Sequence, residues 1–408
     1  MHSVQEAEAI IFNLIKAFNH QTDIETVDLL NADGRVLATP ITSELDFPHW
    51  DNSAMDGYAV RYADVEKCTA EKAIALEIVE EIPAGYQPQS TIQSGQAAQI
   101  FTGAVMPPGA DTVVMQENTR REKNQVFITS TPKSEEFVRK RASYYQAGEE
   151  LLSAGITLKS TEIAVLAAAQ CTQVQVYRRP RIGILSTGNE LITPEQPLKP
   201  GQIVDSNQYA LSALIKEMGA ESLILGIIPD EKAALERAIG NAVNNADVVI
   251  SSGGVSVGEY DYVKNIIESL GGKIQISSVA VKPGKPLTVA NFPNCIYFGL
   301  PGNPVSALVT FWRFVQPVIK KLSGIKDSWQ PEFLQAVTSQ DLRSNGKRET
   351  YLWGKLILKD GLYQFQLAGG SHSSGNLINI TQTNALACLG VGESLIQEGK
   401  KVKVLRVG

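Results

Sequence analysis

Apolar residues recur every three or four positions at the start of the chain, from residue 4 to residue 18. This spacing puts one apolar stripe on a helix and therefore predicts an amphipathic helix. A polar turn at residues 31–34 follows, and then a short strand at residues 35–37. The opening segment is too short to enclose a core, so we expect it to dock on a later part of the chain.

From about residue 74 to residue 138 the pattern is strand-like, with turn residues between short apolar runs. Such a pattern predicts a small all-β domain, with strands at residues 75–78, 97–101, 112–115 and 126–129. Residues 147–177 contain a helical stretch at 161–170 and are expected to close back on residues 1–43. The β domain would then be an insertion within a helical domain.

Strands and helices alternate from residue 181 onward. Strands are predicted at residues 181–185, 222–227, 246–250, 273–280, 287–290 and 295–298, and helices at 206–218, 231–244, 261–270 and 305–322. This alternation predicts a doubly wound α/β sheet with right-handed crossovers, in which ligands bind at the carboxyl ends of the strands. The tail from residue 329 returns to a strand pattern and predicts a small barrel or sandwich.

Composition narrows the class of protein. The 408 residues are too many for one compact core, and 43% hydrophobic with 20% charged residues is typical of a globular protein of two to four domains. A net charge of −6 argues against a nucleic-acid surface and against binding to anionic membranes. The N-terminus has no basic start followed by an apolar block, and no run of 18 apolar residues occurs, which indicates a cytoplasmic protein.

The cysteines and histidines do not form a metal-ligand pattern. None of the cysteines has CxxC spacing, so buried thiols in a reducing compartment are expected; they are Cys68, Cys171, Cys295 and Cys388. The four histidines are equally scattered. A phosphate-bearing ligand would therefore depend on local lysines and arginines.

Residues 251–264 form the stretch with the strongest chemical character. A Gly-Ser loop joins a buried strand to a helix, and at such a junction glycines let the backbone approach a ligand while free amides attract anions. Glu259 and Asp261 add carboxylates where a divalent cation bridging to phosphate would need them. The alternative is a glycine-rich turn in which Asp261 only caps its helix.

Several more polar loops follow predicted strands of the same segment. Their candidate residues are Ser186, Thr187, Gly188, Glu190, Asp230, Ser252, Gly253, Gly254, Ser256, Lys282, Lys285, Pro301, Gly302 and Asn303. Each loop has a structural alternative: Asp230 and Asn303 suit helix starts, and the two lysines suit a surface turn. Together they favour a site for a phosphorylated, ring-bearing ligand with a divalent cation.

Polar residues also gather outside the α/β segment. Residues 47–61 crowd acids, an amide and a hydroxyl around Asp56, which is typical of a ligand-presenting loop or of an Asx-rich turn. Thr102 follows a strand, and residues 139–141 form a basic cluster that is either solvated or neutralises phosphate. In the tail, Arg348 and the polar turn at residues 370–374 are further candidates to reach the site.

Five of these stretches resemble, in order and spacing, the molybdopterin molybdenumtransferase family, whose relatives include the gephyrin E domain. They are residues 51–59 (DNSAMDGYA), 186–188 (STG), 251–258 (SSGGVSVG), 282–286 (KPGKP) and 300–304 (LPGNP). The resemblance covers essentially the whole chain. It implies a discontinuous helical domain (1–43 and 142–177), an inserted β domain (44–141), a molybdopterin-binding α/β domain (178–323) and a C-terminal β-barrel (324–408).

The resemblance also implies a reaction. Molybdate is inserted into adenylylated molybdopterin with release of AMP, assisted by Mg²⁺, in a homodimer whose active sites combine the α/β domain of one subunit with the inserted domain of the other. It further implies contact with a molybdopterin adenylyltransferase. Two alternatives stand beside this reaction: a pterin-binding scaffold without turnover, and a pterin adenylyltransferase, which is normally a single α/β domain.

Functional positions of the family map onto this chain as expectations. The catalytic set is Asp56, Thr102, Glu190, Asp230 and Asp261, of which the last three would bind the metal; Lys282, Lys285, Arg348 and Ser371 would bind phosphate or molybdate. Arg139, from the basic cluster rather than from the family pattern, is a further candidate for substrate binding. Two positions depart from the family pattern. Tyr144 lies in a stretch that usually carries an acid, and Asn189 stands where aspartate is common.

Overall fold

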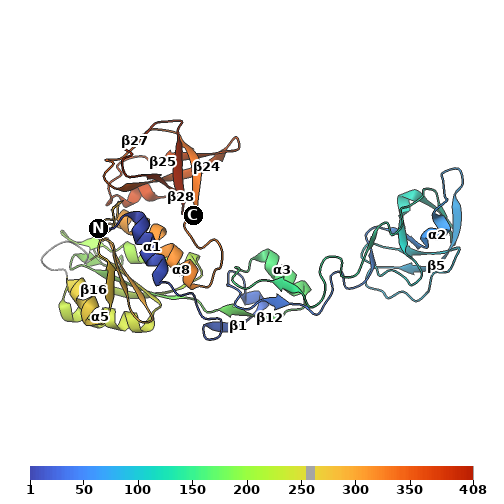
Figure 1. Cartoon of the computed structure of the whole chain (residues 1–408), viewed down its shortest axis with the longest axis horizontal. Helices are drawn as coiled ribbons and strands as arrows, with labels where there is room; N and C mark the ends of the chain where they lie inside the picture. Colours follow the sequence, from blue (N-terminus) through green and yellow to red (C-terminus); the bar gives the residue numbers. More distant parts are fainter. Residues whose placement is uncertain (254–261, 408) are drawn as a thin grey trace. The chain divides into compact units, whose positions relative to one another are not determined.

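The computed structural model describes residues 1–253 and 262–407. Its contacts divide the chain into two compact units (Figure 1). The first unit comprises Met1–Thr39, Ala154–Ala164 and Thr172–Gly408, and the second unit comprises Pro40–Ser153 and Val165–Cys171. The finer division into four domains, with the boundaries given above, stays a prediction.

The second unit is built on one six-stranded sheet, and the four strands predicted between residues 75 and 129 all form; the short helix α2 (Tyr62–Val65) lies between two of its strands in the sequence. Its strand order is β7 (Thr112–Met115), β4 (Gly57–Val60), β6 (Gln96–Ile100), β5 (Ile74–Ile82), β9 (Gln125–Ile128) and β8 (Thr119–Glu122). Tyr58 and Val60 belong to one apolar cluster and Ala59 to another. Since successive side chains of a strand point to opposite faces, β4 is covered on both sides.

The opening helix packs on the first unit. Helix α1 (Val4–Leu14) starts at a capping box between Ser3 and Glu6 and buries Val4, Ala7 and Ile11. These residues share a core with the central sheet, which confirms that the N-terminal segment docks on a later part of the chain. The strand expected at residues 35–37 is reduced to isolated bridges, and β1 (Ile24–Asp28) pairs with β12 (Gln173–Tyr177). Helix α3 (Ser160–Ala168) lies where a helix was predicted.

The central sheet is doubly wound, as predicted. Its order is β16 (Glu221–Ile228), β13 (Arg181–Thr187), β17 (Val248–Ser252), β21 (Ile296–Leu300), β20 (Thr288–Asn291) and β18 (Lys273–Ile276). The first four strands are parallel. Strand β20 runs antiparallel to both neighbours, because the four residues between it and β21 are too few for a crossover.

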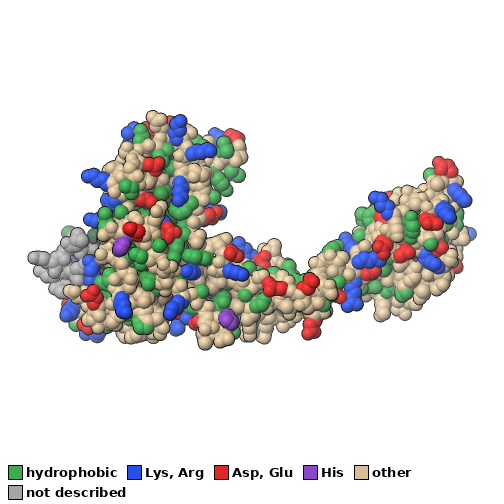
Figure 2. Space-filling model, viewed as in Figure 1, with side chains coloured by type: hydrophobic (Ala, Val, Ile, Leu, Met, Phe, Trp, Pro, Cys, Tyr) green, Lys and Arg blue, Asp and Glu red, His purple; other side chains and the backbone are tan. Residues whose placement is uncertain are grey.

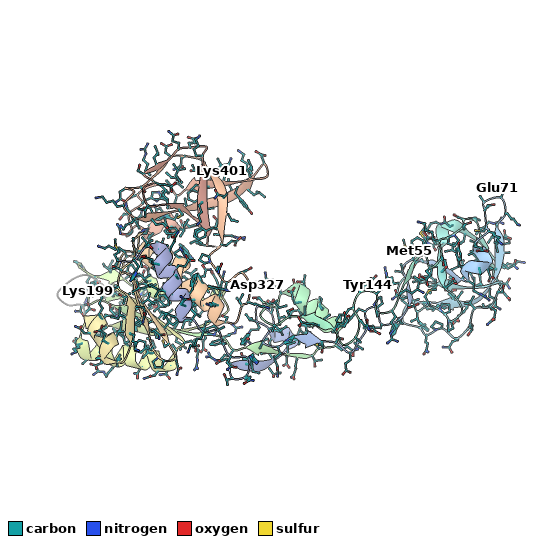
Figure 3. All side chains as sticks on the ribbon, in the orientation of Figure 1. Met55, Glu71, Tyr144, Lys199, Asp327 and Lys401 are labelled. Carbon is teal, nitrogen blue, oxygen red and sulfur yellow. The ribbon has the colours of Figure 1, made fainter. Side chains whose placement is uncertain are left out.

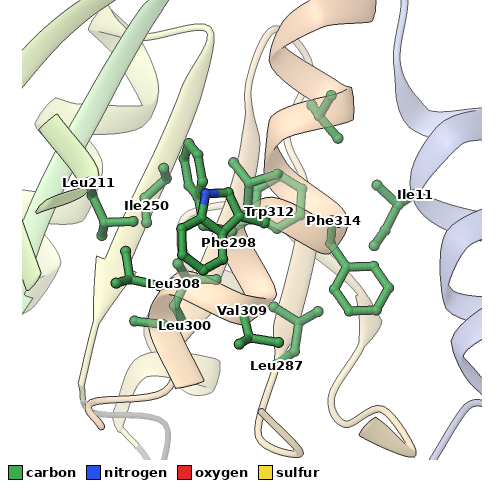
Figure 4. Close-up of a cluster of buried hydrophobic side chains, with 14 of the residues drawn as sticks. Ile11, Leu211, Ile250, Leu287, Phe298, Leu300, Leu308, Val309, Trp312 and Phe314 are labelled. Atoms are coloured by element: carbon green, nitrogen blue, oxygen red, sulfur yellow. The ribbon is translucent and has the colours of Figure 1, made fainter. Parts of the chain in front are cut away.

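Helices cover both faces of this sheet. On one face lie α4 (Asn207–Glu217) and the continuous stretch formed by α7 (Pro304–Thr310), the π-helical turn η3 (Phe311–Val315) and α8 (Gln316–Leu322). Figure 4 shows Leu211, Leu308 and Trp312 from these helices gathered with Ile250 and Phe298 of the sheet. On the other face, α5 (Lys232–Asn245) and α6 (Tyr262–Ser269) share a second core with the sheet.

The tail forms a closed five-stranded barrel, which confirms the predicted C-terminal β-barrel. The ring runs through β24 (Glu349–Lys359), β25 (Leu362–Leu367), β22 (Phe333–Thr338), β28 (Lys401–Arg406) and β26 (Ala385–Leu389), and β26 pairs again with β24. The two-residue strand β19 (Val281–Lys282) adds to β24 from outside the ring.

Surface chemistry agrees with the charge balance of the sequence. On the face drawn in Figure 2, Lys and Arg side chains lie among Asp and Glu side chains on both units. No helix within the described residues is long and apolar enough to cross a membrane. Phosphate or molybdate would thus have to be recognised by local groups rather than by a broad basic face.

Candidate functional site

A pocket of about 1190 Å³ lies at the carboxyl ends of the parallel strands in the first unit. Nine residues that the sequence singled out line it: Thr187, Gly188, Glu190, Asp230, Ser252, Gly253, Pro301, Gly302 and Asn303. They come from the loops that follow β13, β16, β17 and β21. Strand β13 is flanked by β16 on one side and β17 on the other, so the strand order reverses there. A reversal of this kind opens a crevice at the sheet edge.

Glycine is required where two of these loops meet. Gly253 has a φ of +90°, and a Cβ at this position would collide with the carbonyl oxygen of Thr187. Gly302 lies on the other side, where an added Cβ would come to 3.5 Å from the Cα of Gly253. The backbones of three strand ends therefore pack closely and leave the floor of the pocket to small residues and main-chain groups.

Two carboxylates converge on one side of the pocket. Reduced solvation raises the pKa of Asp230, and the nearby negative charge of Glu190 raises it further. The backbone N–H of Asp230 donates a hydrogen bond to Oδ1 of Asn189 at 3.1 Å, so Asn189 ties the loop after β13 to the loop after β16. An amide at position 189 keeps this link and adds no third charge to the pair.

The acidic pair suits a hard cation with partial protein coordination. Mg²⁺ takes oxygen ligands and is commonly held by one or two carboxylates together with substrate phosphates. Across residues 1–253 and 262–407, no group of three or more His, Cys, Asp and Glu side chains is arranged to hold a metal. Gly254, Ser256 and Asp261 lie outside the described residues, so the third predicted ligand is not part of this geometry.

Buried polar atoms without partners surround the same strand ends. Within the described part of the chain, Oγ of Ser186, Oγ1 of Thr187 and Oδ2 of Asp205 have no hydrogen-bond partner. Ser186 is buried and does not line the pocket, whereas Thr187 and Asp205 line it. Unpaired buried polar groups are costly, which favours a polar ligand or further loop groups at this position.

Two residues of the pocket wall, Asp205 and Asn207, were not predicted from the sequence. Oδ1 of Asp205 accepts hydrogen bonds from the backbone N–H groups of Asn207 (3.0 Å) and Gln208 (3.3 Å), and so caps α4. Nδ2 of Asn207 donates to Oγ of Ser252 (2.6 Å) and to the carbonyl of Gly302 (2.8 Å). The signal was present as an Asp-Ser-Asn run before a predicted helix, but a cap and a pocket residue look alike in sequence.

The loop that carries Lys282 and Lys285, the lysine loop, does not lie where the sequence predicted it. Lys282 was expected at the carboxyl end of a central-sheet strand, but β18 ends at Ile276 and Lys282 belongs to β19, which pairs with the barrel strand β24. Lys282 and Lys285 are exposed and do not line the pocket. The reason is that residues 277–280 leave the sheet before β19 begins.

One predicted residue of the tail contacts this loop, and the polar turn of the tail contacts the start of α7. Nη1 of Arg348 donates to the carbonyl of Val281 at 3.0 Å. Ser371 is exposed and is not a pocket-lining residue, but Gly375 and Leu377 are. The carbonyl of Ser374 accepts a hydrogen bond from the backbone N–H of Val305 at 3.2 Å, which fixes the polar turn to the start of α7.

The remaining predicted residues belong to the second unit. Oδ1 of Asp56 accepts hydrogen bonds from the backbone N–H (2.7 Å) and the hydroxyl (2.8 Å) of Thr102, and these bonds lower the pKa of Asp56. Both residues are exposed. Tyr144 is 70% exposed (Figure 3).

The basic cluster is largely neutralised. Lys140 pairs with Asp51 at 3.4 Å and Glu135 at 3.0 Å, and Arg141 pairs with Asp46 at 2.5 Å. In the described ranges Arg139 forms no ion pair; it pairs through its backbone with Asn52. Of the three basic residues, only Arg139 keeps a charge without an acidic partner.

Comparison with known proteins assigns all of these segments to one family. Family models match residues 2–169 (MoeA N-terminal region, domain I and II), 183–321 (probable molybdopterin binding domain) and 335–407 (MoeA C-terminal region, domain IV). The chain is 63% identical over its full length to a molybdopterin molybdenumtransferase of Nostoc sp. strain PCC 7120, covering 94% of that protein. The chain belongs to the molybdopterin molybdenumtransferase family.

More distant members agree with this assignment. A molybdopterin molybdenumtransferase of Haemophilus influenzae is 37% identical over 86% of both chains. A crystal structure of a molybdopterin biosynthesis MoeA protein from Pyrococcus horikoshii OT3 superposes with a TM-score of 0.86 at 26% identity, covering all of both chains. The predicted family and the predicted multidomain α/β fold with a β-barrel are therefore confirmed.

Proposed function

We propose that this molybdopterin molybdenumtransferase family member inserts molybdenum into molybdopterin, as a transferase. In our proposal the substrates are molybdate and adenylylated molybdopterin, and AMP is released. The observation that carries the proposal is the pocket at the strand ends, to which four of the five family-like stretches contribute lining residues; the stretch 282–286 does so only through Pro286. A scaffold without turnover and an adenylyltransferase are not favoured, because the relatives over the full length are named for the transferase.

Within this proposal the pocket takes the pterin and its nucleotide. Its volume of about 1190 Å³ suits a ligand larger than one ring system. Gly188, Gly253 and Gly302 supply main-chain groups without side-chain bulk, and Thr187 supplies a hydroxyl whose oxygen has no partner among the described residues. The polar edge of a pterin and the phosphates of the nucleotide match such groups.

Molybdate would bind at the lysine loop. Lys282 ends β19, Lys285 follows it in the same loop, and Nη1 of Arg348 donates to the carbonyl of Val281 at 3.0 Å. By family resemblance, Ser371 would add a hydroxyl. Two anionic reactants repel each other, so cationic side chains beside the pocket lower the cost of bringing molybdate to the phosphoanhydride. The dithiolene sulfurs of the pterin would then receive the molybdenum as AMP leaves.

Glu190 and Asp230 would hold Mg²⁺, with Asp261 as a third ligand by family resemblance. The raised pKa of Asp230 supports this role, since a cation bound between two carboxylates offsets the repulsion between their negative charges. When bound, the cation supplies positive charge to the phosphates during cleavage of the anhydride. The carboxylates themselves only hold and orient it.

The groups of the second unit would act across subunits. We propose a homodimer in the cytoplasm, in which Asp56, Thr102 and Arg139 of one subunit complete the site of the other, and in which a molybdopterin adenylyltransferase delivers the substrate. Support comes from Asp56, a fully ionised and oriented carboxylate that no cation partner in the described residues neutralises. Such a group is suited to binding a ligand rather than to stabilising its own loop.

The test is reconstitution with purified full-length protein. Adenylylated molybdopterin, molybdate and Mg²⁺ are supplied, and AMP and molybdenum cofactor are measured. We expect one AMP per cofactor formed and no AMP without molybdate or Mg²⁺. Binding of the pterin with no AMP release would instead support the scaffold, and formation of adenylylated molybdopterin from ATP would support the adenylyltransferase.

A further inference from the structure

The strand that carries Lys282 is held by a very short pairing. Strand β19 consists of Val281 and Lys282, which pair in parallel with Glu349 and Thr350 of β24. Because side chains alternate along strands, a slip of one residue would turn Lys282 to the opposite face. Two residue pairs specify a register weakly, so further contacts must fix β24 in place.

The alternation also separates two sets of side chains. Lys282 shares a face with its partner Thr350 and with Arg348, two residues before Thr350. Val281 and Glu349 point to the other face, and Tyr351 follows Glu349 on that same face. The proposed anion-binding cations and the buried tyrosine are therefore on opposite faces of the β19–β24 pair.

A buried hydrogen-bond network contacts the tyrosine side. Tyr351 is fully buried and its hydroxyl donates to Oε1 of Glu349 at 2.5 Å. Nε of Arg313 donates to the Tyr351 hydroxyl at 2.9 Å, and Nη2 of Arg313 pairs with Glu8 of helix α1. Arg313 lies in the π-helical turn η3 and is 3% exposed. The network thus joins α1, η3 and the first residues of β24.

The energetics make this network sensitive to any change in β24. A buried guanidinium is tolerated only while its partners stay in place, and loss of one partner leaves an uncompensated charge. Burial raises the pKa of Tyr351 well above its usual value, so its hydroxyl keeps its proton and donates to Glu349. Moving Tyr351 or Glu349 would disturb both bonds at once.

The same residues are linked to β19 through the backbone. The N–H of Glu349 donates to the carbonyl of Ala280 at 3.1 Å, and Nη1 of Arg348 donates to the carbonyl of Val281 at 3.0 Å. A shift of Glu349 therefore changes the position of both Lys282 and Arg348.

We infer that Arg313 and Tyr351 are positioning residues for the molybdate subsite: by holding Glu349 they keep Lys282 and Arg348 in register on the opposite face of β24. This inference rests on the proposed function of that subsite. Neither residue lines the pocket at the strand ends of the central sheet.

The experiment uses the Tyr351→Phe variant of the full-length chain, which removes one hydroxyl and keeps the ring. We expect the KM for molybdate to rise about tenfold, the effect of one hydrogen bond in a charged network. The KM for adenylylated molybdopterin should change less than about twofold, because its pocket does not contact Tyr351. The matched control is Tyr363→Phe, which removes a hydroxyl from a tyrosine of β25 that is 40% exposed.

A double-mutant cycle separates positioning from general destabilisation. If Tyr351 acts through Lys282, the Tyr351→Phe change should add little to the molybdate KM in a Lys282→Ala background. Independent, additive effects would overturn the inference. So would an equal rise in both KM values, or a lowered melting temperature with an unchanged molybdate KM.

Two safeguards keep the inference testable. If Tyr351→Phe fails to fold, Glu349→Gln replaces it, since glutamine keeps an acceptor for the tyrosine hydroxyl and removes the charge. If the wild-type protein releases no AMP, the proposed function has failed, and calorimetric binding of molybdate to wild type and variant still tests positioning. A tenfold weaker variant supports it, and equal affinities overturn it.

Discussion

The acidic groups of the two units are held in opposite ways. Asp230, in the first unit, has its pKa raised by reduced solvation and by the charge of Glu190. Asp56, in the second unit, has its pKa lowered by two hydrogen bonds from Thr102. A carboxylate with a raised pKa is stabilised by a bound cation, which offsets the cost of its negative charge. A carboxylate with a lowered pKa stays ionised and can orient a hydrogen-bond donor or repel another anion. The contrast shows that two exposed acids of one protein can be suited to different tasks by the charges and hydrogen-bond donors around them.

The largest effect is expected for Asp56→Asn. Loss of an oriented negative charge should lower the rate of AMP release roughly a hundredfold or more, with little change in stability because Asp56 is exposed. AMP release and thermal unfolding are measured together. The control is Glu71→Gln, an exposed acid of the same unit. If the melting temperature falls in proportion to activity, Asp56 is structural and the contrast is lost.

The next effect concerns the floor of the pocket. Gly253→Ala forces a side chain into a backbone with φ +90° and against the Thr187 carbonyl, which should lower the free energy of unfolding by about 1–3 kcal/mol. Gly302→Ala is the matched control, because among the described residues its added Cβ finds no heavy atom closer than 3.5 Å. Stability is measured by urea unfolding. Equal losses for the two variants would show that the close approach of Gly253 to Thr187 does not cause the loss of stability.

A smaller effect is expected for Asp230→Asn. One unit charge near a solvent-screened cation is worth roughly 1 kcal/mol, so the apparent Mg²⁺ affinity in the AMP-release assay should fall about fivefold. Glu231→Gln, the adjacent exposed acid, is the control. An unchanged Mg²⁺ requirement would remove Asp230 from the cation site.

The same variant tests the sign of the pKa shift. Because the pKa of Asp230 is raised on folding, its charge disfavours the folded state at neutral pH, and this penalty disappears as pH falls through the raised pKa. Asp230→Asn should thus be no less stable than wild type at neutral pH, and any advantage should vanish on acidification. A variant less stable than wild type at neutral pH would contradict the shift.

The smallest effect is a change in titration. Thr102→Val removes the hydroxyl bond to Asp56 but keeps the backbone N–H, so the pKa of Asp56 should rise part of the way towards its usual value. The stability that this bond supplies is present above the unfolded pKa and is lost as pH falls through the lowered one. Carboxyl NMR titration of both proteins measures the shift, and an unchanged pKa would mean that the N–H alone fixes Asp56.

Much of the site could be predicted because strand ends have a clear sequence signature. An apolar run followed by glycine and hydroxyl residues located Thr187, Ser252 and Gly253, and parallel strands bring such ends to one edge. Lys282 could not be placed in this way, because the chain leaves the sheet after Ile276 and pairs with a strand almost seventy residues later. Asp205 was missed since a helix cap and a pocket wall carry the same residue types.

The sequence alone determined the order of strands and helices, the glycine-rich strand ends and the family resemblance, because these depend on local periodicity and on the residues of each turn. Only the tertiary structure decided which charges act on each other. The pKa of Asp230 depends on Glu190, which is forty residues away in the chain, and Arg313 reaches Tyr351 from a different element. Electrostatic and hydrogen-bond partners are set by distance in space, which periodicity does not encode.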